Sequence, residues 1–220
     1  GLRKEPVHIR TYLTNILESA ESMRGQRIIT GIETGYYKLD EITSGFQNGD
    51  FVIVAGRPSM GKTAFVLNVA AHAAIENNVP IGIFSLEMAG EALVQRILCT
   101  EAKVSSRNLR RGMLRNEDWV NLATAAGNLD KAPIFIDDSA TLSTLELKAK
   151  ARRLKADQNI QLIIVDYLQL LESPITFRTS SRQQEISEIS RALKGLAKEL
   201  NCPLIVVSQL SRMPEHRDDR

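Results

Sequence analysis

Eight consecutive residues carry the clearest chemical signal in the chain. They begin with Gly56, run over four residues to Gly61, and end in Lys62 and Thr63. Glycines let the backbone curl so that its N–H groups point at a polyphosphate, while the lysine reaches the β- and γ-phosphates and the threonine hydroxyl binds Mg²⁺. We therefore predict that this phosphate loop binds a nucleoside triphosphate. Its residues are Gly56, Arg57, Pro58, Ser59, Met60, Gly61, Lys62 and Thr63.

Asp166 is the predicted partner of Thr63 in a Mg²⁺ site. It directly follows the apolar run Leu162–Val165, and ligands of open parallel sheets bind beyond the carboxyl ends of the strands. A carboxylate there suits a Walker B position that holds Mg²⁺ through water, although it could instead end a strand and cap a turn. Asp137 and Asp138 also follow an apolar run, but that run is shorter and favours a turn or a cap before the next helix.

Two further polar residues follow predicted strands. Glu87 comes after Ile81–Leu86, where it could act as the base or orient the attacking water near the γ-phosphate. Gln209 comes after Leu204–Val207, where its amide could sense the γ-phosphate. An exposed glutamate and a surface amide are the plain alternatives.

Continuous apolar runs separated by helical patterns position these residues. Such runs indicate an α/β fold with a mainly parallel sheet that helices cover on both faces. A terminal cap is expected at Asn116, and a capping box at Ser143 and Glu146. The predicted strands are Phe51–Ala55, Ile81–Leu86, Ile134–Ile136, Leu162–Val165 and Leu204–Val207, and the predicted helices between or beside them are Ala64–Ile75, Glu91–Thr100, Asn116–Leu129, Ser143–Ala156 and Glu185–Leu200.

An amphipathic helix is predicted ahead of this core. Apolar residues recur at helical spacing over Ile9–Met23, and a glycine-rich stretch with one short helix, Gly25–Gly49, then leads to the first strand. The first helix could pack on its own domain or dock on a neighbouring subunit. Its sequence favours neither.

The composition limits the domain number and the classes of partner only broadly. The 220 residues, 43% hydrophobic and 25% charged, suit one α/β domain, and a net charge of +2 does not by itself indicate nucleic-acid or membrane binding. We expect Cys99 and Cys202 to be buried reduced thiols, and the three histidines show no metal-ligand spacing. No apolar run approaches the ~20 residues needed to span a bilayer, so no membrane partner is expected.

The chain contains six ordered motifs: Thr34–Asp40, Gly45–Asp50, Ala55–Thr63, Ser85–Met88, Val165–Gln169 and Val207–Gln209. This ordered set resembles the C-terminal motor domain of the bacterial replicative DNA helicases of the DnaB type. This resemblance implies a RecA-like P-loop NTPase fold, a homohexameric ring, and translocation along single-stranded DNA driven by NTP hydrolysis, usually of ATP. It also implies a linker helix over residues 1–25 and an ATPase motor domain over residues 26–220.

The resemblance assigns a role to each site residue. Lys62 and Thr63 contact phosphate and Mg²⁺, Glu87 is the catalytic base, Asp166 is the Walker B residue and Gln209 is the sensor. The first helix corresponds to the linker helix that packs on the adjacent subunit. Primase and a helicase loader are the implied partners of the full-length protein, in the cytoplasm at the nucleoid.

Two features of the family are expected to lie outside this sequence. Family members carry an N-terminal primase-interacting domain, and they place the arginine finger downstream of the Gln209 motif. Arg212, Arg217 and Arg220 lead towards that region, but none is assigned as the finger. Because the finger acts across a subunit interface, we expect the fragment to bind nucleotide and to hydrolyse it poorly.

DNA contacts are expected in the loops that follow the fourth and fifth strands, because such loops face the central channel of ring motors. This nominates Arg178 and Arg182 in the first loop and Arg212 in the second. A groove that follows a phosphate backbone needs only a few cations per subunit. Solvated surface arginines are the alternative.

Two other functions remain open from the sequence. One is a RecA-like recombinase or a clock-type autokinase on the same fold. The other is a nucleotide-gated interaction module, in which ATP binding assembles a ring that recruits partners. Replacing Glu87 with Gln distinguishes a motor from an interaction module, because a motor would lose unwinding while an interaction module would keep its partners.

Overall fold

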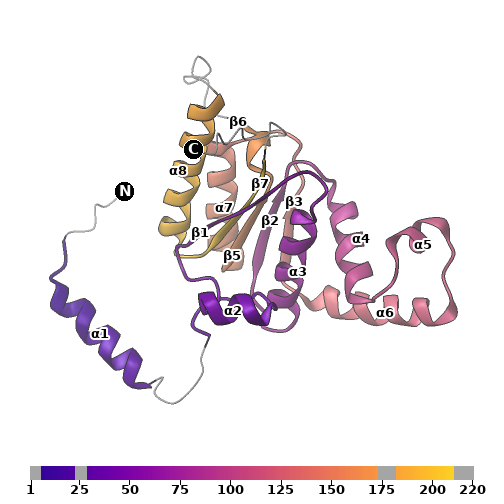
Figure 1. Cartoon of the computed structure of the whole chain (residues 1–220), viewed down its shortest axis with the longest axis horizontal. Helices are drawn as coiled ribbons and strands as arrows, with labels where there is room; N and C mark the ends of the chain where they lie inside the picture. Colours follow the sequence, from indigo (N-terminus) through magenta and orange to yellow (C-terminus); the bar gives the residue numbers. More distant parts are fainter. Residues whose placement is uncertain (1–5, 23–28, 173–181, 211–220) are drawn as a thin grey trace, which may run out of the picture.

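The computed structural model describes residues 6–22, 29–172 and 182–210. A five-stranded sheet forms its centre, with the order β1-β7-β5-β2-β3 and every neighbouring pair parallel (Figure 1). The predicted parallel sheet is therefore confirmed. The strands are β1 (Phe51–Gly56), β2 (Ile81–Ser85), β3 (Ile134–Asp137), β5 (Leu162–Asp166) and β7 (Leu204–Gln209).

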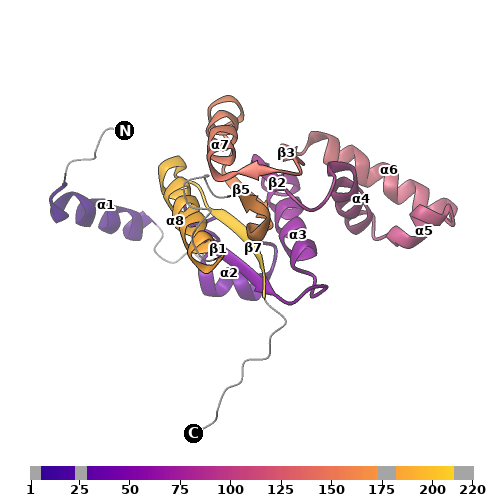
Figure 2. The ribbon, with the colours of Figure 1, turned by 90° about the horizontal axis from the view of Figure 1, so that it is seen from above.

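Helices cover both faces of the sheet, as Figure 2 shows from above. Alternate residues of β5 point to opposite faces, so that Ile163 joins one apolar cluster and Ile164 joins the other. Both residues are fully buried, which explains why this strand is a continuous apolar run. The first cluster includes residues of α7 (Thr144–Gln158) and α8 (Arg182–Leu200), and the second includes residues of α3 (Lys62–Ile75) and α4 (Gly90–Glu101).

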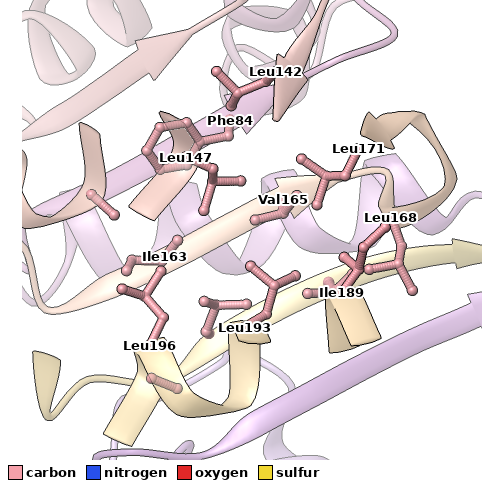
Figure 3. Packing of buried hydrophobic residues seen from close by; sticks show 14 of the residues in the cluster. Phe84, Leu142, Leu147, Ile163, Val165, Leu168, Leu171, Ile189, Leu193 and Leu196 are labelled. Carbon is pink, nitrogen blue, oxygen red and sulfur yellow. The ribbon is translucent and has the colours of Figure 1, made fainter. Parts of the chain in front are cut away.

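The long helix α8 packs its apolar stripe against the first of these clusters. Ile189, Leu193 and Leu196 recur at helical spacing and are at most 1% exposed. Figure 3 shows Leu193 close to Val165 of the central strand and Ile189 close to Leu168. The strand that ends in a candidate metal ligand is thus held from this side by a continuous apolar contact.

Two predicted helix caps have different outcomes. The capping box of α7 is confirmed, since Ser143 Oγ accepts from the Glu146 N–H at 3.2 Å and Glu146 accepts from the Ser143 N–H at 2.9 Å. The prediction that Asn116 caps α6 (Asn116–Lys131) is wrong. Arg115 is the cap residue, because the Asp118 carboxylate accepts from the Arg115 N–H at 2.9 Å and fixes the first turn one residue earlier.

Four short elements were not predicted. They are α5 (Ser106–Arg111), β4 (Leu142–Ser143), the 3₁₀ helix η1 (Leu168–Leu170) and β6 (Leu171–Glu172). Each spans six residues or fewer, so none shows enough repeats for a periodic pattern. β4 and β6 pair with each other in a separate two-stranded sheet.

The predicted N-terminal helix is confirmed as α1 (Ile9–Ser22), and α2 (Tyr37–Thr43) is the short helix expected before β1. Figures 1 and 2 both show α1 apart from the layered body. Its apolar residues Leu13 and Leu17 are 49% and 67% exposed. α1 therefore does not bury its apolar face on the rest of the described chain.

Cys99 and Cys202 are free and buried, as predicted, and burial raises the pKa of both thiols. Among the described helices there is none with the length and apolar character needed to cross a membrane.

Candidate nucleotide-binding site

The phosphate loop connects β1 to α3. Ser59 and Gly61 adopt positive φ angles of 63° and 82°, which turn the chain sharply before α3 begins at Lys62. Gly61 is the cap residue of α3, so the positive end of the helix dipole lies at the loop. The Lys62 ammonium donates to the Arg57 carbonyl at 2.9 Å, which holds the lysine side chain over the loop.

A cavity of about 380 Å³ lies beside this loop, within the usual size range of ligand pockets. It brings together side chains that are up to about 150 residues apart in the sequence, because the carboxyl ends of all the parallel strands meet at one edge. Gly56, Arg57 and Met60 of the predicted loop do not line it, and Met60 is 73% exposed. The lining residues are Pro58, Ser59, Gly61, Lys62, Thr63, Ala64, Glu87, Met88, Arg96, Asp166, Tyr167, Val207 and Gln209.

Asp166 ends β5, lines the cavity and is only 4% exposed. Burial raises the pKa of its carboxyl, and the nearby Glu87 charge adds to this effect. A hydrogen bond from Thr63 and the charges of Lys62 and Arg96 oppose the rise without cancelling it. A partly desolvated carboxylate in this position is stabilised when a cation arrives.

The donor set at Asp166 fits a Mg²⁺ ion. Its Oδ1 atom is buried and has no hydrogen-bond partner in the described part of the chain. Thr63 supplies a hydroxyl beside the same carboxyl group. Thr63 and Asp166 supply oxygen ligands, and a Mg²⁺ ion held there would take phosphate and water oxygens as its other ligands.

Glu87 lies in a bend between β2 and α4 that is fixed by its neighbours. Ser85 Oγ donates to the Met88 carbonyl at 2.7 Å and accepts from the Met88 N–H at 3.2 Å. The Leu86 N–H donates to the Asp166 carbonyl at 2.7 Å, which ties this bend to the end of β5. The Glu87 side chain itself is exposed and lines the cavity, and a carboxylate in such a place can orient a water molecule or accept its proton.

The structure separates the roles of Asp137 and Asp138. Asp137 forms the predicted turn, because it accepts from the Ser139 N–H at 3.1 Å. Asp138 does not act before the helix α7 as predicted, and instead accepts from the Gly90 N–H at 2.8 Å at the start of α4. Asp138 reaches α4 because β3 is the neighbour of β2, so that the end of β3 lies beside the β2–α4 bend.

Arg96 is a cavity residue that the sequence analysis missed. It lies on α4, lines the phosphate-loop cavity, and acts on Asp166 through its charge. It also lines a neighbouring cavity of about 640 Å³ between α3, α4 and α5. No motif signals it, because an arginine on the polar side of an amphipathic helix is ordinarily a solvated residue.

The three arginines proposed to contact DNA are placed only in part. Arg178 and Arg212 lie outside the described residues. Arg182 begins α8, where it pairs with Glu185 and donates to the Gln169 carbonyl. Its DNA contact stays a prediction.

Comparison with known proteins identifies the family. Residues 31–220 match the model of the DnaB-like helicase C terminal domain. The chain belongs to this DnaB-like helicase family. It is 50% identical over 192 residues to the replicative DNA helicase DnaB of Geobacillus stearothermophilus, covering 87% of the chain and 42% of that protein. It is 45% identical over 214 residues to the replicative DNA helicase DnaC of Bacillus subtilis strain 168, covering 97% of the chain and 47% of that protein.

Solved structures show that this DnaB-like domain has the RecA-like fold that the sequence predicted. One solved ATPase domain aligns with a TM-score of 0.87 at 36% identity, over 98% of this chain and 75% of that one. A DnaB-like replicative helicase, solved to show its interactions with primase, aligns with a TM-score of 0.84 at 35% identity, over 100% of this chain and 52% of that one. The chain spans less than half the length of the two relatives above.

Proposed function

We propose that the chain is the ATP-driven motor of a replicative DNA helicase. One observation carries the proposal: Lys62, Thr63, Glu87, Asp166 and Gln209 all line one cavity of a DnaB-like domain. The family match does not favour the recombinase, the autokinase or the interaction module.

Each side chain has a distinct role in the proposed hydrolysis of ATP. Lys62 and the N–H groups of the loop bind the β- and γ-phosphates, and Glu87 orients the attacking water and accepts its proton. Thr63 and Asp166 would hold Mg²⁺, which would supply positive charge beside the phosphates. Gln209 lies at the end of β7, between the phosphate loop and the Walker B strand, where its amide can sense the γ-phosphate.

The proposed motor works as a homohexameric ring on single-stranded DNA. Within it, residues 1–25 act as a linker helix and residues 26–220 as the motor domain. The exposed apolar face of α1 supports docking on a neighbouring subunit, since such a face gains by burial. A primase and a helicase loader are the proposed partners, and a replicative motor would work in the cytoplasm at the nucleoid.

Unwinding of a forked duplex by the full-length protein tests this proposal. Glu87→Gln should abolish unwinding while ATP binding persists, because the amide cannot accept the proton of the attacking water. Glu91→Gln is the matched control, since Glu91 is exposed on the first turn of α4 and does not line the cavity. Unwinding by Glu87→Gln at the rate of the control would refute the assigned role of Glu87.

A further inference from the structure

The side chain of Gln169 joins the turn after β5 to the end of β7. Its Nε2 atom donates to Ser208 Oγ at 2.9 Å and to the Gln209 carbonyl at 3.0 Å. Its Oε1 atom accepts from the Gln209 N–H at 3.2 Å. One side-chain amide therefore binds both backbone polar groups of Gln209, the proposed sensor of the γ-phosphate.

These bonds begin where the ladder between two strands ends. β5 and β7 pair as far as Val165 and Val206. On its other side β7 continues beside β1 until Gln209 lies opposite Gly56. A primary amide offers the same donor and acceptor as a peptide group, so Gln169 takes the place of the missing strand neighbour. Gln209 is thereby held between the phosphate loop and the Walker B turn.

The turn that carries Gln169 is itself anchored in the core. Leu168 and Leu171 flank it and are 2% and 1% exposed. Figure 3 shows both leucines among the packed residues of the cluster that includes α7 and α8, with Leu168 near Ile189 of α8. Because packed leucines resist displacement, Gln169 is a fixed support for the end of β7 rather than a loose surface amide.

The backbone of Gln169 makes a second connection. Its carbonyl accepts a hydrogen bond from the guanidinium of Arg182, the first residue of α8. Gln169 therefore touches β7 through its side chain and α8 through its main chain. Residues 173–181, which precede α8 in the sequence, include Arg178, one of the arginines nominated for DNA, and they lie outside the described residues.

We propose that Gln169 is a positioning residue that fixes Gln209 against the phosphate loop and links its movement to the start of α8. The functional part of this inference rests on the proposed motor function. A change in the hydrogen bonding of Gln209 when the γ-phosphate leaves then reaches α8 through one residue. Gln169 itself lies outside the set of residues that line the phosphate-loop cavity.

Amide hydrogen exchange, read by NMR on this chain, tests the positioning directly. Gln169→Leu removes all three bonds at similar volume, so protection of the Gln209 N–H should fall about tenfold, the usual value of one hydrogen bond. The amide of Val206, which lies within both ladders, is the internal reference. Unchanged protection of Gln209 in Gln169→Leu would overturn the inference.

Two further variants define the result. Gln161→Leu is the matched control, because Gln161 is an exposed glutamine just before the opposite end of β5. It should leave the exchange of Gln209 unchanged. Ser208→Ala removes only one of the three bonds and keeps both contacts to Gln209. The Gln209 N–H should therefore keep its protection in Ser208→Ala. This variant provides the test if Gln169→Leu fails to fold. Loss of the protection of Gln209 in Ser208→Ala would show that the two bonds from Gln169 to Gln209 do not hold the end of β7, and would overturn the inference.

ATP turnover by the full-length protein tests the coupling. Gln169→Leu should lower both kcat and its stimulation by single-stranded DNA about tenfold, while KM for ATP stays within about twofold, because Lys62 and Thr63 are untouched. A purely structural defect would not separate kcat from KM in this way. Full stimulation in the variant would overturn the coupling. If single-stranded DNA did not stimulate ATP turnover by the wild-type protein, the proposed motor function would be refuted. Hydrogen exchange would then still test whether Gln169 positions Gln209.

Discussion

Two carboxylates at the same edge of the sheet differ in their surroundings. Asp166 is 4% exposed and burial raises the pKa of its carboxyl, whereas Glu87 is exposed in the bend before α4. A buried carboxylate beside a hydroxyl suits a cation, and an exposed one within reach of the cavity suits water and a proton. The environment of each residue thus supports the two roles that we propose.

Lys62 should dominate phosphate binding. Replacing it with Ala removes a charged hydrogen-bond donor at the loop and should weaken ATP binding about a hundredfold. Titration with a fluorescent ATP analogue measures the affinity, and Lys38→Ala on the exposed side of α2 is the control. If Lys62→Ala kept the affinity of the control, our account of the phosphate loop would be wrong.

The turn after β3 should give the protein an acid-sensitive contribution to stability. Burial alone would raise the pKa of Asp137, but hydrogen bonds from Lys150 and Ser139 and the Lys150 charge bring it below the ordinary value of 3.8. The Lys150 ammonium lies 2.6 Å from the Asp137 carboxylate. A carboxyl whose folded-state pKa is lowered stabilises the fold above its unfolded pKa, and this contribution is lost as the pH falls through the folded pKa.

Lys150→Met should therefore lower the melting temperature at neutral pH. The loss corresponds to about 1 kcal/mol, since the pair is partly exposed. The difference from the wild type should shrink as the pH falls below 3.8. Thermal melts across this range measure it, with Lys148→Met as the control of equal charge change on the same helix. A difference that stays constant with pH would contradict the role of the Asp137 pair.

The sequence predicted the site residues that follow strands. It did not predict the residues that reach the site from a helix or from a short turn. Asp166 and Glu87 come directly after an apolar run and Gln209 comes one residue later, and parallel strands end at one edge. Arg96 reaches the cavity from the second turn of α4, and Gln169 reaches β7 from an unpredicted 3₁₀ turn. A periodic pattern of apolar residues does not predict either placement, because each placement depends on how one element packs against another.

At the scale of elements, two amphipathic helices with similar patterns have different surroundings. α8 buries its apolar stripe against the sheet, with Leu193 at 0% exposure. α1 leaves its stripe in solvent, with Leu17 at 67% exposure. Periodicity predicted both helices. It could not predict which one would pack on the rest of the chain, because the pattern identifies the apolar face of a helix but not the surface that this face contacts.

This difference predicts unequal effects of the same substitution. Leu193→Ala should lower the free energy of unfolding by about 3 kcal/mol, since it opens a cavity in the core. Leu17→Ala should change it by less than about 0.5 kcal/mol, because its side chain already meets water. Urea unfolding at low protein concentration measures both. An equal loss in both variants would show that α1 packs on its own domain.

At the scale of the whole molecule, the order of the strands builds the site. β7 lies between β1 and β5, so the end that carries Gln209 is placed between the phosphate loop and Asp166. The bend after β2 brings Glu87 to the same cavity. Residues from the ends of four strands therefore line one cavity, and we propose that they meet the γ-phosphate of bound ATP there.

The most direct test of the motor is ATP turnover by the full-length protein at increasing protein concentration, with and without single-stranded DNA. A DNA-driven ring predicts that turnover per subunit rises with concentration as subunits assemble, and rises again when DNA is added. Glu87→Gln should remove turnover under every condition. Turnover that is the same per subunit at all concentrations and unaffected by DNA would contradict the proposed motor.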